Sequence, residues 1–361
     1  MFRLVAISTL PRLFSMASQK QNAGDSSTNI QAESITIHQG VSLEAVRQVA
    51  LDIFRANFYE LAGEAKDIAQ RRAEEITEDF LRKLEQENAS GLKQSQQPDF
   101  QHALFTVQKE YARCGDKELG NLLIDLLVDR TKQDARTILQ IVLNESLAVA
   151  PKLTSDQLAA LSVIFLLRYT TNASLANHEL LWQYLDLQVA PFVPLLNKKD
   201  SCYQHLEYSG CGTPSPFKSE LIDTFRNDYG GLFSKGIDAS EREAMQLSVT
   251  PDLMWCRCLN DNTRLQVAAL NEGVVRSKAA ELKISDEDME KLVQLHKDSL
   301  MDAKEIRERI IAARPYMNTV FEMWSDSGLG RFTLTSVGIA IGHANVKKSL
   351  GEFTNLSTWI N

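Results

Sequence analysis

Residues 99–167 read DFQHALFTVQKEYARCGDKELGNLLIDLLVDRTKQDARTILQIVLNESLAVAPKLTSDQLAALSVIFLL and carry the strongest structural signal in the chain. Apolar residues recur along this segment at steps of three and four, the period of a helix that buries one face. Helix-start residues divide the segment into four parts, at Asp99, Asp116, Asp134 and Thr154. Four apolar-faced helices with short connections predict a helical bundle, which we place over residues 99–200. The fold class is therefore expected to be mainly α.

The composition is that of an ordinary globular protein. Of 361 residues, 44% are hydrophobic and 24% are charged, so the chain can bury a core without disulfides or metals. The formal net charge of −8 argues against a general nucleic-acid binder, which would show a basic face. The longest apolar run, residues 158–167, is about half of the roughly 20 residues that a membrane span needs. No transmembrane segment is expected.

Five cysteines, an odd number without framework spacing, fit free thiols in a reducing compartment, and we expect a cytoplasmic protein. Cys202, His205 and Cys211, with Cys256 and Cys258 further along, are the best candidates for metal ligands. Thiolates and imidazole suit zinc, and such a site would make the chain a metal-dependent enzyme. We favour the alternative, in which these cysteines are unmodified thiols and no cofactor is bound.

The first 40 residues are expected to contain one short strand. Residues 1–29 are interpreted as a flexible extension, in which residues 1–15 precede a second start at Met16 or form a presequence. Residues 30–40 are predicted to form a β segment, because apolar and polar residues alternate around Thr36. One strand is not stable alone, so it pairs with a distant strand of this chain or with another copy. We favour a homo-oligomer, through Ile30, Ile35 and Ile37.

Residues 41–90 are predicted to form a long amphipathic helical segment that begins at Ser42, a suitable N-cap. The pattern allows one long helix or two helices in line. Its charged positions, Lys83 among them, are interpreted as a solvated, salt-bridged face. A polar linker is expected over residues 85–98.

The second half of the chain is expected to be less regular at first and then helical. Residues 201–261 are predicted to be an irregular, cysteine-containing region, because residues 200–217 have the composition of a loop. Residues 262–361 are predicted to form a C-terminal helical domain. Within it, one helical pattern begins at Asn262 and another runs from Ser285 to Arg314.

The chain closes with a strand and a helix. Arg331–Thr335 alternates as a short strand, and Thr335 or Ser336 then caps a helix of small residues. This arrangement is similar to the end of many winged-helix domains. A nucleic-acid-binding regulator is therefore an alternative function, with Arg331, Lys347 and Lys348 as phosphate contacts. The net charge of −8 makes nucleic acid the less favoured partner.

No catalytic motif is recognisable in the sequence. Phosphate-binding loops, a nucleophile elbow and zinc-protease spacings of histidine are absent. The most conspicuous histidine is His343, between Gly342 and Ala344, where packing or capping is a better interpretation than catalysis. We therefore assign no catalytic residue and expect a protein that is not an enzyme.

The two ends of the chain carry a family resemblance. The segments AGDSSTNIQA (23–32), ITI (35–37), FRANF (54–58) and RAEE (72–75) resemble the opening of a family of uncharacterised bacterial proteins. LTSVGIAIGHAN (334–345) and LSTWI (356–360) resemble its ending. The helical block followed by this ending is more distantly similar to the Abi-alpha group, associated with abortive phage infection.

The resemblance implies a bacterial setting in phage defence, but it supplies no catalytic residues. Together with the unpaired strand and the amphipathic helices, it favours a non-catalytic helical protein. We expect this protein to act through self-association and contacts with an unidentified protein partner.

Overall fold

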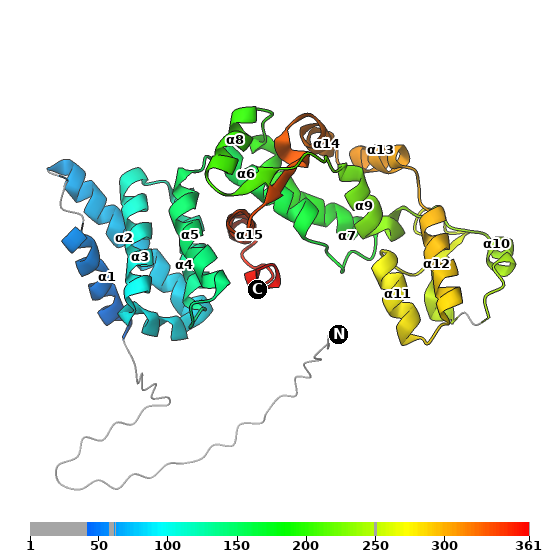
Figure 1. The fold of residues 1–361 in the computed structure, drawn as a ribbon, viewed down its shortest axis with the longest axis horizontal. Helices are drawn as coiled ribbons and strands as arrows, with labels where there is room; N and C mark the ends of the chain where they lie inside the picture. Colours follow the sequence, from blue (N-terminus) through cyan, green and yellow to red (C-terminus); the bar gives the residue numbers. More distant parts are fainter. Residues whose placement is uncertain (1–41, 58–60, 62, 249–250, 361) are drawn as a thin grey trace, which may run out of the picture. The chain divides into compact units, whose positions relative to one another are not determined.

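The computed structural model describes residues 42–57, 61, 63–248 and 251–360, which belong to one compact unit, Val41–Asn361. The mainly α fold is confirmed, with fifteen α-helices and four three-residue strands within the described residues (Figure 1). The expected extension at residues 1–29 and the β segment at 30–40, with Ile30, Ile35 and Ile37, lie outside them. None of the described helices combines the length and the apolar character needed to cross a membrane.

Residues 41–90 are helical, but the arrangement differs from both expected alternatives. Helices α1 (Leu43–Asn57) and α2 (Glu64–Asn88) are antiparallel neighbours, with Arg47 paired to Glu78 and Arg55 lying 4.0 Å from Glu74. The interpretation as one helix or two in line is wrong, because Gly63 turns the chain with a φ of 58°. The expected linker is also wrong, since α2 continues into the 3₁₀-helix η1 (Ala89–Gln96).

The predicted bundle is present, and two of its helices begin at the expected caps, Asp116 and Thr154. The expected starts at Asp99 and Asp134 are displaced, because the caps there are Gln97 and Thr137. Its helices are α3 (Pro98–Cys114), α4 (Lys117–Thr131), α5 (Ile138–Val149) and α6 (Ser155–Ile164). Asp116 accepts hydrogen bonds from the amides of Glu118 and Leu119, and Thr154 forms a capping box with Gln157. The chain continues through the π-helical turn η3 (Phe165–Tyr169), α7 (His178–Tyr184), η4 (Leu185–Val189) and η5 (Ala190–Leu195). These helices share one core with the end of the chain.

The middle of the chain is more regular than its composition suggested. Residues 200–208 form a helix, not a loop, because Cys202, Tyr203 and Leu206 are spaced to bury one face. The following elements are β1 (Gly212–Pro214), α9 (Leu221–Tyr229), η6 (Gly230–Phe233), α10 (Ala239–Ala244), η7 (Asp252–Met254) and β2 (Trp255–Arg257). The preceding helix, Asp200–Tyr208, is α8.

Two predictions for the C-terminal helices need correction. Residues 265–267 form β3 (Leu265–Val267), antiparallel to β2, so helix α11 (Glu272–Glu281) begins later than Asn262. The segment from Ser285 contains two helices, α12 (Asp286–Asp298) and α13 (Ala303–Ala313). The expected single helix is interrupted after Asp298, and Asp302 then caps a new helix, α13. Buried Met254, Val267, Val275 and Leu292 form a second, smaller core here.

The closing strand and helix are confirmed. After α14 (Met317–Asp326) and η8 (Gly328–Gly330), strand β4 (Phe332–Leu334) pairs antiparallel with β1. Thr335 caps α15 (Ser336–Leu350) by accepting from the Gly338 amide, and η9 (Leu356–Thr358) follows. Ten consecutive residues of α15, from Gly338 to Lys347, are buried against neighbours that include α4, α5 and α6. The last helix is therefore a central core helix.

Gly338 tests this packing of α15. A Cβ added there would lie 1.9 Å from the carbonyl oxygen of Cys211, closer than van der Waals contact allows. Gly338→Ala is expected to lower the free energy of unfolding by about 3 kcal/mol, as overpacked cores do. Gly273→Ala in α11 is the matched control, because its Cβ would meet only Asn271 Oδ1 at 3.3 Å. Urea unfolding followed by circular dichroism measures the two midpoints. Equal midpoints for the two variants would contradict the close packing of α15 against Cys211.

Candidate functional site

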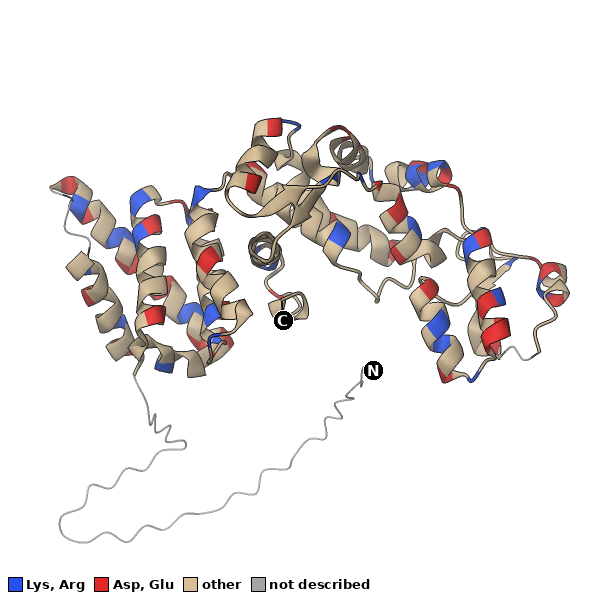
Figure 2. Ribbon diagram, viewed as in Figure 1, with Lys and Arg blue, Asp and Glu red and all other residues tan. Residues whose placement is uncertain are grey.

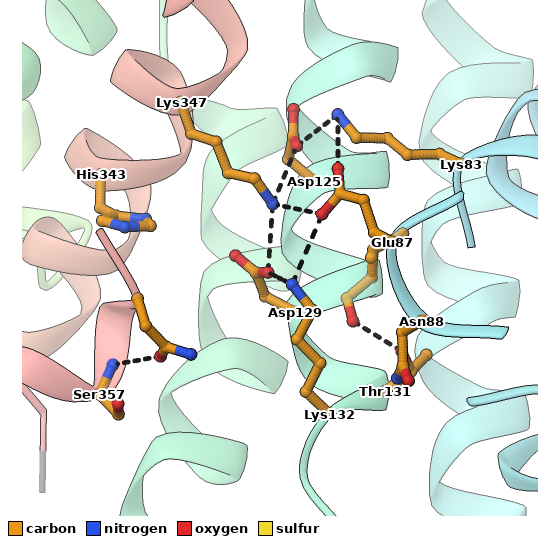
Figure 3. A network of polar contacts seen from close by, with 12 residues as sticks. Lys83, Glu87, Asn88, Asp125, Asp129, Thr131, Lys132, His343, Lys347 and Ser357 are labelled. Carbon is orange, nitrogen blue, oxygen red and sulfur yellow. Dashed lines mark hydrogen bonds and ion pairs between the residues drawn. The ribbon is translucent and has the colours of Figure 1, made fainter. Parts of the chain in front are cut away.

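Six charged side chains from three helices form one cluster, which we call the ion network (Figure 3). Its members are Lys83 and Glu87 of α2, Asp125 and Asp129 of α4, Lys132 directly after α4, and Lys347 of α15. The α2 and α4 residues are three or four positions apart within each helix, which places them on one face. Segments far apart in the sequence thus meet at a single polar centre.

Lys347 is the central cation of the ion network. Its Nζ donates to Glu87 Oε2 at 2.8 Å and to Asp129 Oδ1 at 3.2 Å. It also lies 3.6 Å from Asp125 Oδ1. The Lys347 side chain is 8% exposed, so the ammonium is removed from water and depends on these carboxylates.

The other two lysines complete the neutralisation. Lys83 Nζ lies 2.5 Å from Asp125 Oδ1, and Asp125 is fully buried. Lys132 Nζ donates to Asp129 Oδ1 at 2.7 Å and to Glu87 Oε2 at 3.5 Å. Three cations therefore face three carboxylates, and the ion network as a whole is neutral.

Burial and pairing act in opposite directions on these groups. For Glu87 and Asp129, burial would raise the pKa, but the neighbouring ammonium groups, Lys347 first, outweigh it and lower both pKa values. For Asp125 burial wins and raises the pKa, although Lys83 and Lys347 oppose it. Burial would lower the pKa of Lys347, yet the carboxylates, led by Asp129, raise it. The arrangement holds Lys347 charged inside the protein.

A cavity of about 550 Å³ adjoins the ion network. It lies beside Glu87, Asp129, Lys132 and Lys347, and residues 351–356 close another side. His343 also lines the cavity, although only 2% of its surface is exposed. Charged groups, a histidine and a cavity therefore share one place in the fold.

His343 is held by both a hydrogen bond and aromatic contacts. Nε2 lies 2.6 Å from the Thr354 carbonyl oxygen, so Nε2 carries the proton and donates. The ring makes edge contacts with Phe165 and Phe353, at centroid distances of 5.8 and 5.5 Å. Burial lowers the pKa of His343, which keeps the ring neutral near pH 7. Nδ1 is buried and has no hydrogen-bond partner among the residues that the structure describes.

The proposed metal ligands are not brought together. Across the described residues, no group of three or more His, Cys, Asp or Glu side chains is placed to hold a metal ion. His205 Nδ1 lies 3.0 Å from the Gln157 amide nitrogen. Burial raises the pKa of Cys202 to about 11 and of Cys211 to about 12, which keeps both thiols protonated near pH 7. Cys258 donates to the Ser234 carbonyl oxygen, and Cys256 is half-buried.

The three residues proposed to contact nucleic acid do not form one basic surface. Lys347 belongs to the ion network and Lys348 donates to Glu118 at 2.7 Å, while Arg331 is exposed before β4. Helix α15 is buried on several sides and offers no free face to a nucleic-acid groove. Lys and Arg are interspersed with Asp and Glu along the described helices (Figure 2).

A second candidate surface is the exposed side of residues 180–195, which we call the leucine face. Its exposed residues are Leu180, Gln183, Leu187, Pro191, Pro194 and Leu195. None of them is charged, and Leu187 is 65% exposed. The opposite side of the same segment is buried in the main core, through residues such as Leu181 and Leu185. Exposed apolar residues that gather in this way are typical of a docking surface.

The sequence does not predict the ion network: Lys83, expected on a solvated face, is paired with buried Asp125. One signal was present: Asp125 stands inside the apolar run LLIDLLVD, and Asp129 follows four residues later. An acid at an apolar helix position needs a buried cation. The identity of that cation was not predictable, because Lys347 is 260 residues from its partner Glu87.

Removing the central cation tests the ion network. Lys347→Met leaves buried carboxylates without their main partner and is expected to lower the free energy of unfolding by about 3–5 kcal/mol at pH 7. Lys348→Met is the control, because its partner Glu118 is exposed, and the expected loss is below about 1 kcal/mol. Equal losses in urea unfolding would show that Lys347 contributes no more than a surface pair.

The loss of stability in Lys347→Met is expected to depend on pH. Glu87 and Asp129 have lowered pKa values in the folded state, so their stabilisation is present above their unfolded pKa values of about 4. It is lost as the pH falls through the folded values. The difference in the free energy of unfolding between the wild type and Lys347→Met, measured by urea unfolding, should therefore become smaller as the pH falls below about 4.

Comparison with known proteins adds a family but no activity. No curated protein and no solved structure matches the chain. A family model described as ":-like" matches residues 40–360, which include α1 to α15 and both small sheets. The chain belongs to the family that this model represents.

Proposed function

We propose that this protein is not an enzyme and that it acts by self-association and by contacts with other proteins. The observation that carries the proposal is the leucine face, whose exposed residues carry no charge, on a segment whose other side is buried in the core. The ion network supports it indirectly. Its charges satisfy one another, as expected of groups that stabilise the fold.

The ends of the leucine face favour a second copy as the partner. Glu179 is exposed at one end and Lys199 at the other. In a twofold contact the same surface meets itself, so two antiparallel segments would place Glu179 of each copy near Lys199 of the other. Apolar contact along the middle and opposite charges at both ends make the surface complementary to itself.

The oligomeric state tests this proposal. Wild-type protein is expected to be an oligomer in light scattering, and Leu187→Glu is expected to reduce the mass per particle, because it places a charge in the contact. Phe217→Glu is the control, since Phe217 is exposed outside the leucine face, and it should leave the mass unchanged. A monomeric wild type, or an unchanged mass for Leu187→Glu, would contradict assembly through this face.

The N-terminal segment is a second proposed contact, through Ile30, Ile35 and Ile37. Deletion of residues 16–40 is expected to lower the number of copies per particle relative to the full-length protein. An identical copy number with and without these residues would remove that segment from the assembly, and the leucine face would remain.

We further propose a bacterial, cytoplasmic setting in phage defence, which rests on the family resemblance alone. Bacteria that express the wild type are expected to give fewer plaques with at least one phage of a diverse panel than cells with an empty vector. Leu187→Glu, produced at the same level, should restore plaque number if assembly is needed. No protection against any phage would contradict this setting and leave the assembly proposal standing.

A further inference from the structure

A second cavity, of about 500 Å³, is lined by three parts of the chain. They are residues 169–173, the pair Tyr184 and Gln188, and four residues between Phe353 and Trp359. None of the described residues in this lining carries a charge near neutral pH, and we call the space the neutral cavity. Its volume lies within the range of small-molecule sites.

Two π-helical turns contribute to the neutral cavity. The turn η3 ends at Tyr169 and leads into residues 170–173 of the lining, and η4 contains Gln188. In the part of the chain that the structure describes, these are the only π-helical turns. Such turns are rare and are found frequently at functional sites. Pro191 contributes to the irregularity of η4, because it has no amide hydrogen, but no proline lies in η3 or directly after it.

The first side of the neutral cavity offers two amide groups that the fold does not use fully. Asn172 accepts from the Ser174 amide through Oδ1, which leaves its Nδ2 without a partner among the described residues. The amide group of Gln188 forms no hydrogen bond with them either. Both residues are half-buried, and neither has a polar atom that is enclosed without a partner. These amide groups therefore remain accessible to a ligand.

The second side offers two hydroxyl groups. Thr354 and Thr358 are exposed, and their hydroxyl groups have no hydrogen-bond partner within the described ranges. The Thr354 carbonyl oxygen accepts from His343, so the backbone beside one hydroxyl is fixed. Hydroxyl and amide groups both donate and accept, and a hydroxyl group on a ligand can pair with any of them. An ionised ligand would lose hydration here without meeting an opposite charge.

Aromatic residues supply the apolar part of the lining. They are Tyr169, Tyr184, Phe353 and Trp359. Trp359 Nε1 donates to the Tyr169 carbonyl oxygen at 2.6 Å, and the Tyr169 hydroxyl accepts from the Leu334 amide at 2.8 Å. These two side chains are thereby held in place. A few polar groups among aromatic side chains are typical of small-molecule sites.

We propose that the neutral cavity binds an uncharged sugar. Its hydroxyl groups pair with Asn172 and Gln188 on one side and with Thr354 and Thr358 on the other. No residue of the ion network or of the leucine face lines this cavity, and the inference goes beyond the proposed function.

The probes are glucose, galactose, mannose and maltose, and the uronates of the three hexoses are the charged controls. Calorimetric titration of the full chain should give saturable binding of at least one neutral sugar. The uronates should bind at least about tenfold more weakly than that sugar, because no cation in the lining compensates the carboxylate. Absence of saturable binding for all four probes, or a uronate that binds as tightly as the neutral sugar, would overturn the proposal.

Two variants locate the site. Gln188→Met keeps the length of the side chain without its amide, and Thr358→Val keeps the shape without the hydroxyl. Each is expected to weaken binding of the sugar by about fivefold, the loss of one hydrogen bond between uncharged groups. Gln294→Met is the control, because Gln294 is exposed on α12 and outside the lining, and affinity should stay the same.

Unchanged affinity in both Gln188→Met and Thr358→Val would place the sugar elsewhere and reject the site. Circular dichroism checks the fold, and Thr358→Val at its exposed position decides the matter should Gln188→Met not fold. The number of copies per particle is measured in parallel by light scattering. A failure of assembly is thereby distinguished from a failure of sugar binding.

Discussion

The pairing of the buried Lys347 ammonium group with three carboxylates is the interaction on which the remaining structure depends. It is surrounded by Glu87, Asp125 and Asp129, which come from helices formed more than 200 residues earlier in the chain. A charge removed from water is tolerated only when its partners are fixed at short distance. Helix α15 is thereby held in one position and rotation against α2 and α4.

Other features follow from that position of α15. Gly338 brings the start of the helix against the Cys211 carbonyl, and Thr335 caps it directly after β4 pairs with β1. One turn before Lys347, His343 is directed into its aromatic surroundings, and the chain after the helix folds back over it. The cavity is thus a consequence of how the C-terminal segment covers the ion network. The leucine face is supported by the same core, because its buried side packs in the cluster that contains α15.

Local features of the fold were predictable from the sequence, and long-range ones were not. Helix starts at Asp116, Thr154 and Thr335 were predicted because cap residues act within one turn. The loop predicted for residues 200–217 failed because glycines and prolines at its end obscured the helical spacing of Cys202 and Leu206. Strand β3 was missed because three residues give too short a pattern to distinguish from a helix. Lys347 could be recognised as a cation near a helix end, but its burial depends on partners that no local pattern specifies.

The coupling between Lys347 and Asp129 is the most direct test of this account. A double-mutant cycle with Lys347→Met, Asp129→Leu and the two changes together measures it through urea unfolding at pH 7. Residues that share a buried network are expected to show a coupling energy of about 2 kcal/mol, with the double variant more stable than the sum of single losses predicts. Losses that add to within about 0.5 kcal/mol would show that the two groups act independently, and would contradict the claim that the ion network positions α15.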